Sequence, residues 1–251
     1  MQRDRSIVLS VAGFDPSAGA GVLADIKTFE ASFVYGLAIC TANTFQTDQS
    51  FLRCDWFKIE DVEQQIEILS NRFSIEVVKI GIVPNFNFLE KVADKILKNN
   101  PLCKIIWDPV YKSSTGFQFF DTEWTNEDRN RVLSKLYLLT PNTAESKVFS
   151  KCEDALDGGK YLSQFCSVLL KGGHSSVSSS SDILFAHSKE IVFESDRFKT
   201  QGKHGSGCVL SASIAAQLSL GCSLEEACVE AKKYISNYLL SSENLLGYHN
   251  V

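Results

Sequence analysis

The sequence lacks the residue patterns that build metal centres and disulfide frameworks. It has only four histidines and one methionine, and none of its eight cysteines falls into a CxxC pair. Neither a zinc site nor a set of disulfides is therefore indicated, and the cysteines predict core thiols in a reducing compartment. No uncharged apolar run approaches the roughly 18 residues of a membrane-spanning helix. We expect a cytoplasmic protein with no membrane partner.

A basic surface and a P-loop are also absent. The formal net charge is -5, which argues against nucleic acid as a partner because such proteins carry a basic face. No GxxxxGK[ST] motif occurs, which excludes a P-loop. The negative net charge is still compatible with a small anionic ligand in a local pocket. Hydrophobic residues make up 44% of the chain and include 17 Phe, enough for one domain over residues 1–251. The sequence leaves open whether the chain forms a homodimer.

Strand-like and helix-like segments alternate along the chain. The short apolar stretch at 6–12 follows two arginines, but Asp15-Pro16 comes directly after it, which favours a buried strand over a signal peptide. Helical periodicity is present at 22–33, 62–69 and 86–97. Further strands are predicted at 37–46, 77–82, 104–107, 136–140 and 167–170, and the strand at 37–46 has few charges, which predicts burial on both faces. This alternation predicts a mainly parallel sheet covered by helices on both faces, with ligands at the carboxyl ends of the strands.

The last third of the chain has a different pattern. Residues 182–199 contain two short alternating runs that predict an antiparallel edge hairpin. The serine-rich stretch at 175–181 is low in complexity and predicts a mobile loop within the domain. Residues 207–240 predict further helices with apolar faces to bury.

A glycine-rich turn runs directly into one of these helices as His204-Gly205-Ser206-Gly207-Cys208. Glycines allow the backbone to turn its N–H groups inward, and the first N–H groups of a helix lack internal partners and face the positive end of its dipole. This pattern predicts an anion site. A thiol in the same field is expected to have a lowered pKa, which would make Cys208 a base or nucleophile. The alternative is a packing turn with a buried cysteine.

A second glycine-rich loop, residues 13–21, follows the first predicted strand. Gly19 to Ala24 satisfies the pattern GxGxxA, and Asp48 closes the second strand about where a dinucleotide-binding fold places its ribose acid. An NAD enzyme is therefore a competing hypothesis. Against it, the predicted strand ends near Ala12, which leaves a loop too long for the tight first turn of that motif. Taken alone, the loop is equally compatible with ligand binding and with a structural turn.

Several motifs in order along the chain resemble the ribokinase-like kinases, and more narrowly the hydroxymethylpyrimidine and phosphomethylpyrimidine kinases of thiamine biosynthesis. They cover nearly the whole chain, and they are the motifs at 12–21, 24–29, 79–81, 108–110, 140–142, 171–174 and 204–208. The resemblance implies a three-layer α/β fold and transfer of the ATP γ-phosphoryl group to the hydroxymethyl oxygen of 4-amino-5-hydroxymethyl-2-methylpyrimidine, with a second transfer to its monophosphate in relatives.

The resemblance also implies roles for individual residues. Gly205, Ser206, Gly207 and Cys208 would bind the moving phosphoryl group, and Cys208 would deprotonate or orient the accepting hydroxyl. Asp108 and Glu145 would hold Mg²⁺ partly through water, because this ion prefers oxygen ligands. The other implied contacts fall into two sets: the nucleotide would meet Asn142, Glu145, Lys171 and Lys232, and the pyrimidine would meet Gly13, Ala20, Asp25, Gln46 and Val110. Several of these residues have plainer explanations, such as helix capping by Asn142 and solvation of either lysine.

Four positions depart from the usual family pattern, namely Phe14, Ala18, Lys203 and Ser206, and the tail at 247–251 lacks the customary ending. Lys203 is expected to add positive charge beside the phosphoryl path, and Phe14 to narrow the acceptor pocket. The nearest alternative function is a pyridoxal or pyridoxine kinase, because its acceptor also carries a hydroxymethyl group on an aromatic nitrogen ring. A non-catalytic sensor of the pyrimidine or nucleotide is a more distant alternative.

Overall fold

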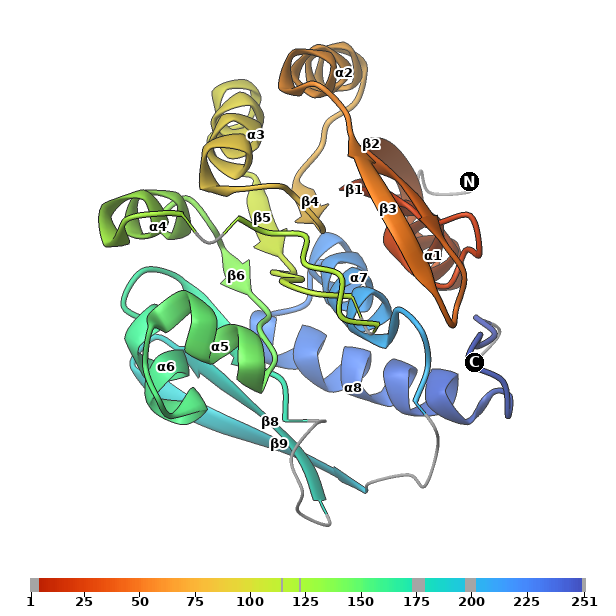
Figure 1. Ribbon diagram of the computed structural model, residues 1–251, viewed down its shortest axis with the longest axis vertical. Helices are drawn as coiled ribbons and strands as arrows, with labels where there is room; N and C mark the ends of the chain where they lie inside the picture. The colour runs from red at the N-terminus through yellow and green to blue at the C-terminus, as the bar shows by residue number, and fades with distance from the viewer. Residues whose placement is uncertain (1–4, 114, 122, 173–178, 197–201, 250–251) are drawn as a thin grey trace.

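A single sheet runs through the part of the chain that the structure describes. The computed structural model describes residues 5–113, 115–121, 123–172, 179–196 and 202–249. The strands lie in the order β3-β2-β1-β4-β5-β6-β7-β8-β9 (Figure 1). Their bounds are β1 Ile7–Phe14, β2 Tyr35–Gln46, β3 Phe51–Trp56, β4 Val77–Ile80, β5 Lys104–Trp107, β6 Leu138–Leu139, β7 Ser167–Leu170, β8 Ser179–Ala186 and β9 Lys189–Asp196. The helices are α1 Gly21–Ala31, α2 Ile59–Arg72, α3 Phe86–Asn99, α4 Asn126–Leu133, α5 Thr143–Ser150, α6 Ala155–Leu162, α7 Ser206–Ser219 and α8 Leu224–Leu240.

The middle of the sheet is parallel and its edges are antiparallel. β2, β1, β4, β5, β6 and β7 pair in parallel, while β3 pairs antiparallel with β2 at one edge. At the other edge β8 pairs antiparallel with β7, and β9 with β8. Parallel neighbours need long crossovers, and helices supply most of them here. The carboxyl ends of six strands therefore open at the same edge of the sheet.

Two hydrophobic cores cover the two faces of the sheet, because neighbouring strand residues point to opposite sides. Leu9 and Val78 join the core beneath α2, α3 and α4, whereas their neighbours Val8 and Val77 join the core beneath α1, α7 and α8. Figure 1 shows these two groups of helices on either side of the strands. The predicted α/β fold of three layers, with a mainly parallel sheet, is confirmed.

Most predicted elements match the structure closely, and three predictions need correction. β5, β7 and the edge hairpin lie where they were expected. β3 was not predicted, because its charged residues Arg53 and Asp55 hide the strand pattern. β2 is not buried on both faces: within the predicted range Ala38 is exposed, and Leu37 and Cys40 are partly exposed. The predicted loop at 175–181 lies outside the described residues up to 178, and Ser179 to Ser181 form the start of β8.

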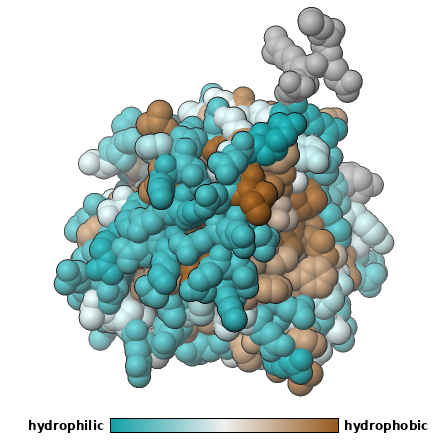
Figure 2. All heavy atoms as spheres, turned by 90° about the horizontal axis from the view of Figure 1, so that it is seen from above, coloured by the Kyte–Doolittle hydropathy of each residue, from teal (hydrophilic) through white to brown (hydrophobic). Residues whose placement is uncertain are grey.

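The outer surface seen from the α2 and α3 end is mostly hydrophilic. Figure 2 shows this face, with one hydrophobic area toward one side. Among the described residues, exposed apolar side chains include Ile68 on α2 and Leu52 on β3. None of the described helices combines the length and the apolar character needed to cross a membrane.

Candidate active site

A cavity of about 610 Å³ lies at the carboxyl edge of the parallel strands. Its walls come from segments that follow β1, β4, β5, β6 and β7 and from the amino end of α7. The structure brings all but one of the predicted site residues to this cavity: Gly13, Ala20, Gln46, Val110, Asp108, Asn142, Glu145, Lys171, Lys232, Gly205, Ser206, Gly207 and Cys208. Asp25 is the exception.

Residues 202–208, here called the second glycine loop, end in the first turn of α7. Gly205 has a φ of 73°, and a Cβ at this position would lie 2.0 Å from the carbonyl oxygen of Gly19. Only glycine fits this contact, which holds the loop against residues 13–21. The N–H groups of Gly207 and Cys208 have no backbone acceptor among the described residues, as expected for the first turn of a helix. The helix therefore presents these amides to the cavity, where an anion would be bound.

Asp15 organises residues 13–21, here called the first glycine loop. Its fully buried carboxylate accepts hydrogen bonds from the N–H groups of Ser17, Gly19 and Ala20 at 2.9, 3.2 and 2.9 Å. The same group contacts Nε2 of His204 at 2.8 Å. Burial raises the pKa of Asp15, but hydrogen bonds from His204 and Ser17 outweigh it and leave the pKa lowered. One carboxylate thus ties the two glycine loops together.

Cys208 lines the cavity, but its thiol is not activated as the sequence predicted. Burial raises the pKa of Cys208 to about 11, and the nearby charges of Asp108 and Asp25 act in the same direction. Lys79 and the N–H group of Gly21 favour the thiolate but do not outweigh burial. The expected lowering of this pKa was therefore wrong, because partial burial of the residue disfavours the thiolate more than Lys79 and the Gly21 N–H favour it. With this pKa the group is a thiol at neutral pH.

Asp25 lies beneath the cavity and does not line it. Its carboxylate is fully buried, accepts hydrogen bonds from Lys79 Nζ at 2.9 Å to each oxygen, and receives the Ser10 hydroxyl at 2.5 Å. Burial lowers the pKa of Lys79, but Asp25 outweighs it and the pKa is raised. The predicted hydrogen bond from a ligand to Asp25 is not supported by this geometry. Asp25 instead holds the buried ammonium of Lys79, which itself reaches the cavity wall.

Asp108 and Lys171 form an ion pair beside the amino end of α7. Lys171 Nζ lies 2.7 Å from Asp108 Oδ1, and the hydroxyls of Thr140 and Ser211 donate to the same carboxylate at 3.2 and 3.3 Å. A Cβ on Gly207 would lie 3.4 Å from Lys171 Nζ, so the lysine adjoins the free amides. Burial raises the pKa of Asp108, yet Lys171 and Lys79 hold it below its ordinary value. The pair therefore stays ionised next to the anion site.

Asn142 and Glu145 form a capping box at the start of α5. The Asn142 side chain accepts from the Glu145 N–H at 2.9 Å, and Glu145 Oε2 accepts from the Asn142 N–H at 2.8 Å. Burial raises the pKa of Glu145 to about 7, although Lys171 opposes the shift. The capping explanation for Asn142 is thus correct, and its side chain still adjoins the cavity.

Lys232 is held by Asp182 at the far wall of the cavity. Its Nζ lies 2.5 Å from Asp182 Oδ2, and Asp182 Oδ1 accepts from the Gly172 N–H at 2.9 Å. Lys203 also lines the cavity, but its ammonium donates to the carbonyl oxygens of Ser242 and Asn244. The Lys203 ammonium is therefore directed away from the N–H groups of Gly207 and Cys208. It does not add charge beside the phosphoryl path as expected. Phe14 is not among the lining residues, so the expected narrowing is not found.

Comparison with known proteins identifies the family. The model of the phosphomethylpyrimidine kinase family matches residues 15–250. The chain belongs to the phosphomethylpyrimidine kinase family. Curated relatives include the hydroxymethylpyrimidine/phosphomethylpyrimidine kinases of Escherichia coli K12, at 30% identity over 97% of this chain and 94% of that protein, and of Aquifex aeolicus, at 31% over 95% and 96%.

Solved structures agree with the family fold. A phosphomethylpyrimidine kinase from Clostridium difficile has a TM-score of 0.78 at 28% identity, with 93% of this chain and 99% of that chain covered. An ADP complex of Bacillus subtilis pyridoxal kinase has a TM-score of 0.87 at 24% identity, with 98% of each chain covered. The second likeness shows the fold alone. By family, this protein is a kinase.

A kinase site needs charge neutralisation for phosphates, and Mg²⁺ is the usual ion. No group of three or more His, Cys, Asp or Glu side chains in the described ranges is placed to hold a metal. Asp108 and Glu145 line the same cavity as Lys171, whose charge acts on both carboxylates. Such a set fits Mg²⁺, which keeps several waters and takes its remaining ligands from phosphates.

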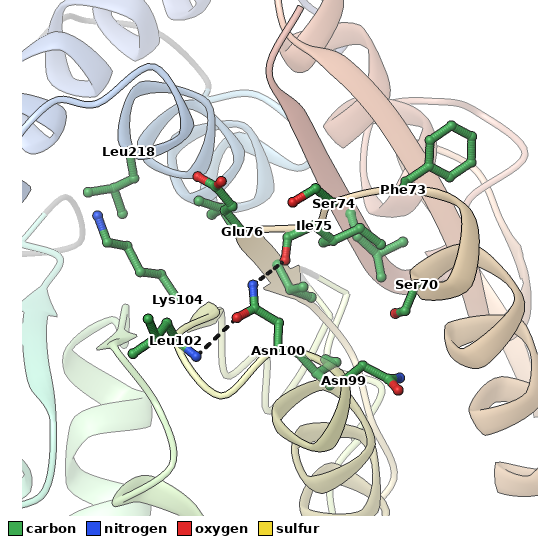
Figure 3. A pocket seen from close by; sticks show the side chains of 14 residues that line it. Ser70, Phe73, Ser74, Ile75, Glu76, Asn99, Asn100, Leu102, Lys104 and Leu218 are labelled. Atoms are coloured by element: carbon green, nitrogen blue, oxygen red, sulfur yellow. Dashed lines mark hydrogen bonds between the residues drawn. The ribbon is translucent and has the colours of Figure 1, made fainter.

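A second cavity of about 600 Å³ lies at the amino end of the strands (Figure 3). Its wall includes the starts of β4 and β5 and the ends of α2 and α3. The most central polar side chain, Asn100, donates to the Ile75 carbonyl at 3.0 Å and accepts from the Leu102 N–H at 3.1 Å. The side chain of Asn100 therefore serves the backbone. Glu76 and Lys104 also line this cavity, whereas the residues of the glycine loops line the other one.

The sequence missed several residues of the kinase site. Asp15, Lys79, Asp182 and His204 all line the cavity. Lys79 and Asp182 join ion pairs, and Asp15 contacts Nε2 of His204. Asp15 and His204 lie inside the two glycine motifs, so the sequence could have suggested each of them. They contact each other, however, across 189 residues of sequence. Only the folded chain shows that they meet.

Proposed function

We propose that the protein transfers the γ-phosphoryl group of ATP to the hydroxymethyl oxygen of 4-amino-5-hydroxymethyl-2-methylpyrimidine, and a second one to the resulting monophosphate. The observation that carries this proposal is the contact between the two glycine loops at Gly205 and Gly19. A Cβ at Gly205 would also lie 2.7 Å from the Ala20 Cα, so the residue proposed to bind the acceptor adjoins the second glycine loop. Family membership and the names of the curated relatives support the substrate class.

The donor side combines fixed amides with a buried cation. As charge accumulates on the phosphoryl oxygens, the N–H groups of Gly207 and Cys208 would stabilise it by donating hydrogen bonds without reorganisation, and Lys171 would add positive charge beside them. Asn142 and Lys232 would contact the nucleotide along the same wall. Mg²⁺ held by Asp108 and Glu145 would neutralise phosphate charge when bound. These groups suit phosphoryl transfer, which depends mainly on alignment and charge.

The acceptor side contains an amide whose orientation is fixed. The Thr44 hydroxyl donates to the Phe14 carbonyl at 2.8 Å, so its oxygen accepts from Gln46 Nε2 at 2.7 Å. Gln46 is left with its carbonyl oxygen and one N–H, which match the exocyclic amine and a ring nitrogen of an aminopyrimidine. Gly13, Ala20 and Val110 would bound the ring. The sequence-based role of Gln46 therefore stays as proposed.

Cys208 is the residue we place next to the accepting hydroxyl. With its pKa raised to about 11, the sulfur is a thiol at neutral pH. A thiol orients a hydroxyl but takes no proton from it, so orientation is the role we assign in the resting site. Deprotonation of the hydroxyl would require the thiolate, which Lys79 favours from beneath.

The test is a coupled assay with purified protein, Mg-ATP and a small panel of acceptors. The panel contains the hydroxymethyl aminopyrimidine, its monophosphate, pyridoxal and pyridoxine. We expect the highest kcat/KM for the aminopyrimidine. A strong preference for pyridoxal would overturn the acceptor assignment in favour of a pyridoxal kinase. Saturable NADH binding without any response to ATP would overturn the kinase proposal, and pyrimidine binding without turnover would indicate a sensor.

A further inference from the structure

Lys203 is a buried cation whose bonds all lead to the C-terminal part of the chain. Its Nζ donates to the Ser242 carbonyl at 2.5 Å, to the Ser242 hydroxyl at 3.0 Å and to the Asn244 carbonyl. The residue is only 7% exposed, although it belongs to the second glycine loop and lines the cavity. Three acceptors use the three protons of the ammonium, which leaves none for a phosphate in this arrangement.

Residues 242–248, here called the C-terminal segment, follow the end of α8 and contact both glycine loops. The Leu245 carbonyl accepts from the His204 N–H at 2.9 Å, and the Leu246 side chain lies against Gly19. The Ser242 hydroxyl donates to the Leu246 carbonyl at 2.7 Å, and the Tyr248 N–H donates to Ser241 at 2.8 Å. Figure 1 shows this end of the chain beside the end of α8.

We propose that Lys203 is a positioning residue that joins the C-terminal segment to the second glycine loop and so fixes the amides of Gly207 and Cys208. The loop has two points of attachment to this segment, the Lys203 ammonium and the His204 amide. Gly205, the next residue, makes the close contact with Gly19. Because these three residues are consecutive, a shift of the C-terminal segment is transmitted to the start of α7. The ammonium also lies where the negative end of α8 favours a cation.

The competing explanation is direct binding of phosphate by Lys203. In that case the ammonium would leave Ser242 and Asn244 when nucleotide binds, and its removal would weaken ATP binding. Under our proposal the ammonium stays in place, and its removal moves the loop amides. A displacement of about 1 Å at the reacting groups is expected to lower turnover by up to two orders of magnitude. The two explanations therefore differ in whether KM or kcat responds.

The test compares Lys203→Met, which keeps the chain length but removes every donor, with Lys203→Arg and with Lys98→Met at an exposed site on α3. Hydrogen exchange of peptides covering 202–208 and 242–248 is measured in the full-length protein. Steady-state kinetics follow, with whichever acceptor the wild type phosphorylates fastest. We expect at least about tenfold faster exchange in Lys203→Met at both segments, and kcat lowered by about tenfold or more with both KM values within threefold. Lys203→Arg should restore much of the protection and turnover, and Lys98→Met should match the wild type.

Three results would overturn the proposal. Unchanged exchange in both segments would show that Lys203 does not hold them, whatever the protein phosphorylates. Faster exchange with unchanged kcat would show that the segment does not position the site. A raised KM for ATP with unchanged exchange would indicate direct phosphate binding. If Lys203→Met does not fold, Ser242→Ala removes one acceptor of the same ammonium and is expected to give a smaller change in the same direction. The exchange measurements do not depend on the proposed function, so its failure and the failure of this inference remain distinguishable.

Discussion

Gly205→Ala tests the contact between the two glycine loops most sharply. A Cβ at Gly205 would lie 2.0 Å from the Gly19 carbonyl oxygen and 2.7 Å from the Ala20 Cα, whereas real Cβ atoms keep at least 3.0 Å. The loops must therefore separate by about 1 Å. Both neighbours are backbone atoms, so no side chain can rotate away. A misplacement of this size is expected to lower kcat by about 100-fold.

The left-handed backbone of Gly205 gives an alanine at this position a second cost in stability, and Gly221→Ala measures that cost without a steric clash. Gly221 has a φ of 93°, and a Cβ at this position would meet nothing within 4 Å; the residue lies beyond the far end of α7. Gly221→Ala should lose about 1–2 kcal/mol of stability with kcat unchanged. Steady-state kinetics and urea unfolding are measured for both variants. If folded Gly205→Ala keeps a kcat within threefold of Gly221→Ala, the loop contact does not set the reaction geometry.

Three further predictions concern stability, each measured by urea unfolding. The folded pKa of Glu145, about 7, exceeds its ordinary 4.5, so the wild type should lose up to about 3 kcal/mol as pH rises from 4.5 through 7. Glu145→Gln should lack this loss, and an identical pH dependence in both proteins would contradict the assigned burial. Lys79→Met leaves the Asp25 carboxylate buried without its cation and should lower the free energy of unfolding by about 3–5 kcal/mol. Adding Asp25→Asn should restore part of this stability, and a loss below about 1 kcal/mol in Lys79→Met would refute the buried pair. Ala18 has a φ of 58°, so Ala18→Gly should stabilise the protein by about 0.5–1 kcal/mol, and a destabilised variant would show that the strain is not there.

The sheet and the edge hairpin could be predicted from the sequence because they depend on local patterns. β5 and β7 are short apolar runs bounded by polar residues, and burial on both faces produces that pattern. β3 escaped prediction because an edge strand alternates exposed charges with partly buried residues, as Arg53 and Asp55 show. The neighbouring strand β2 was predicted to be buried on both faces because it carries few charges, yet Ala38 on it is exposed.

The cavity residues could be named from motifs, whereas their electrostatics could not. The pKa of Cys208 depends on how far water is excluded and on the charges of Asp108 and Asp25, none of which a local pattern contains. Asp25 was expected to face the ligand because it follows the first glycine loop by one turn, yet Lys79 from β4 turns its carboxylate into the core. Lys203 likewise finds its partners about 40 residues later in the chain, beyond α8.

The central claim is that the amides at the amino end of α7 stabilise the transferring phosphoryl group while the sulfur of Cys208 orients the accepting hydroxyl. Its most direct test is the initial rate of Mg-ATP-dependent phosphorylation of the hydroxymethyl aminopyrimidine by the wild type and by Cys208→Ala, with pyrimidine binding measured in parallel. We predict that the variant binds the pyrimidine with little change while its turnover falls by about 100-fold, because the hydroxyl loses its orientation. Unchanged turnover in Cys208→Ala would contradict the account.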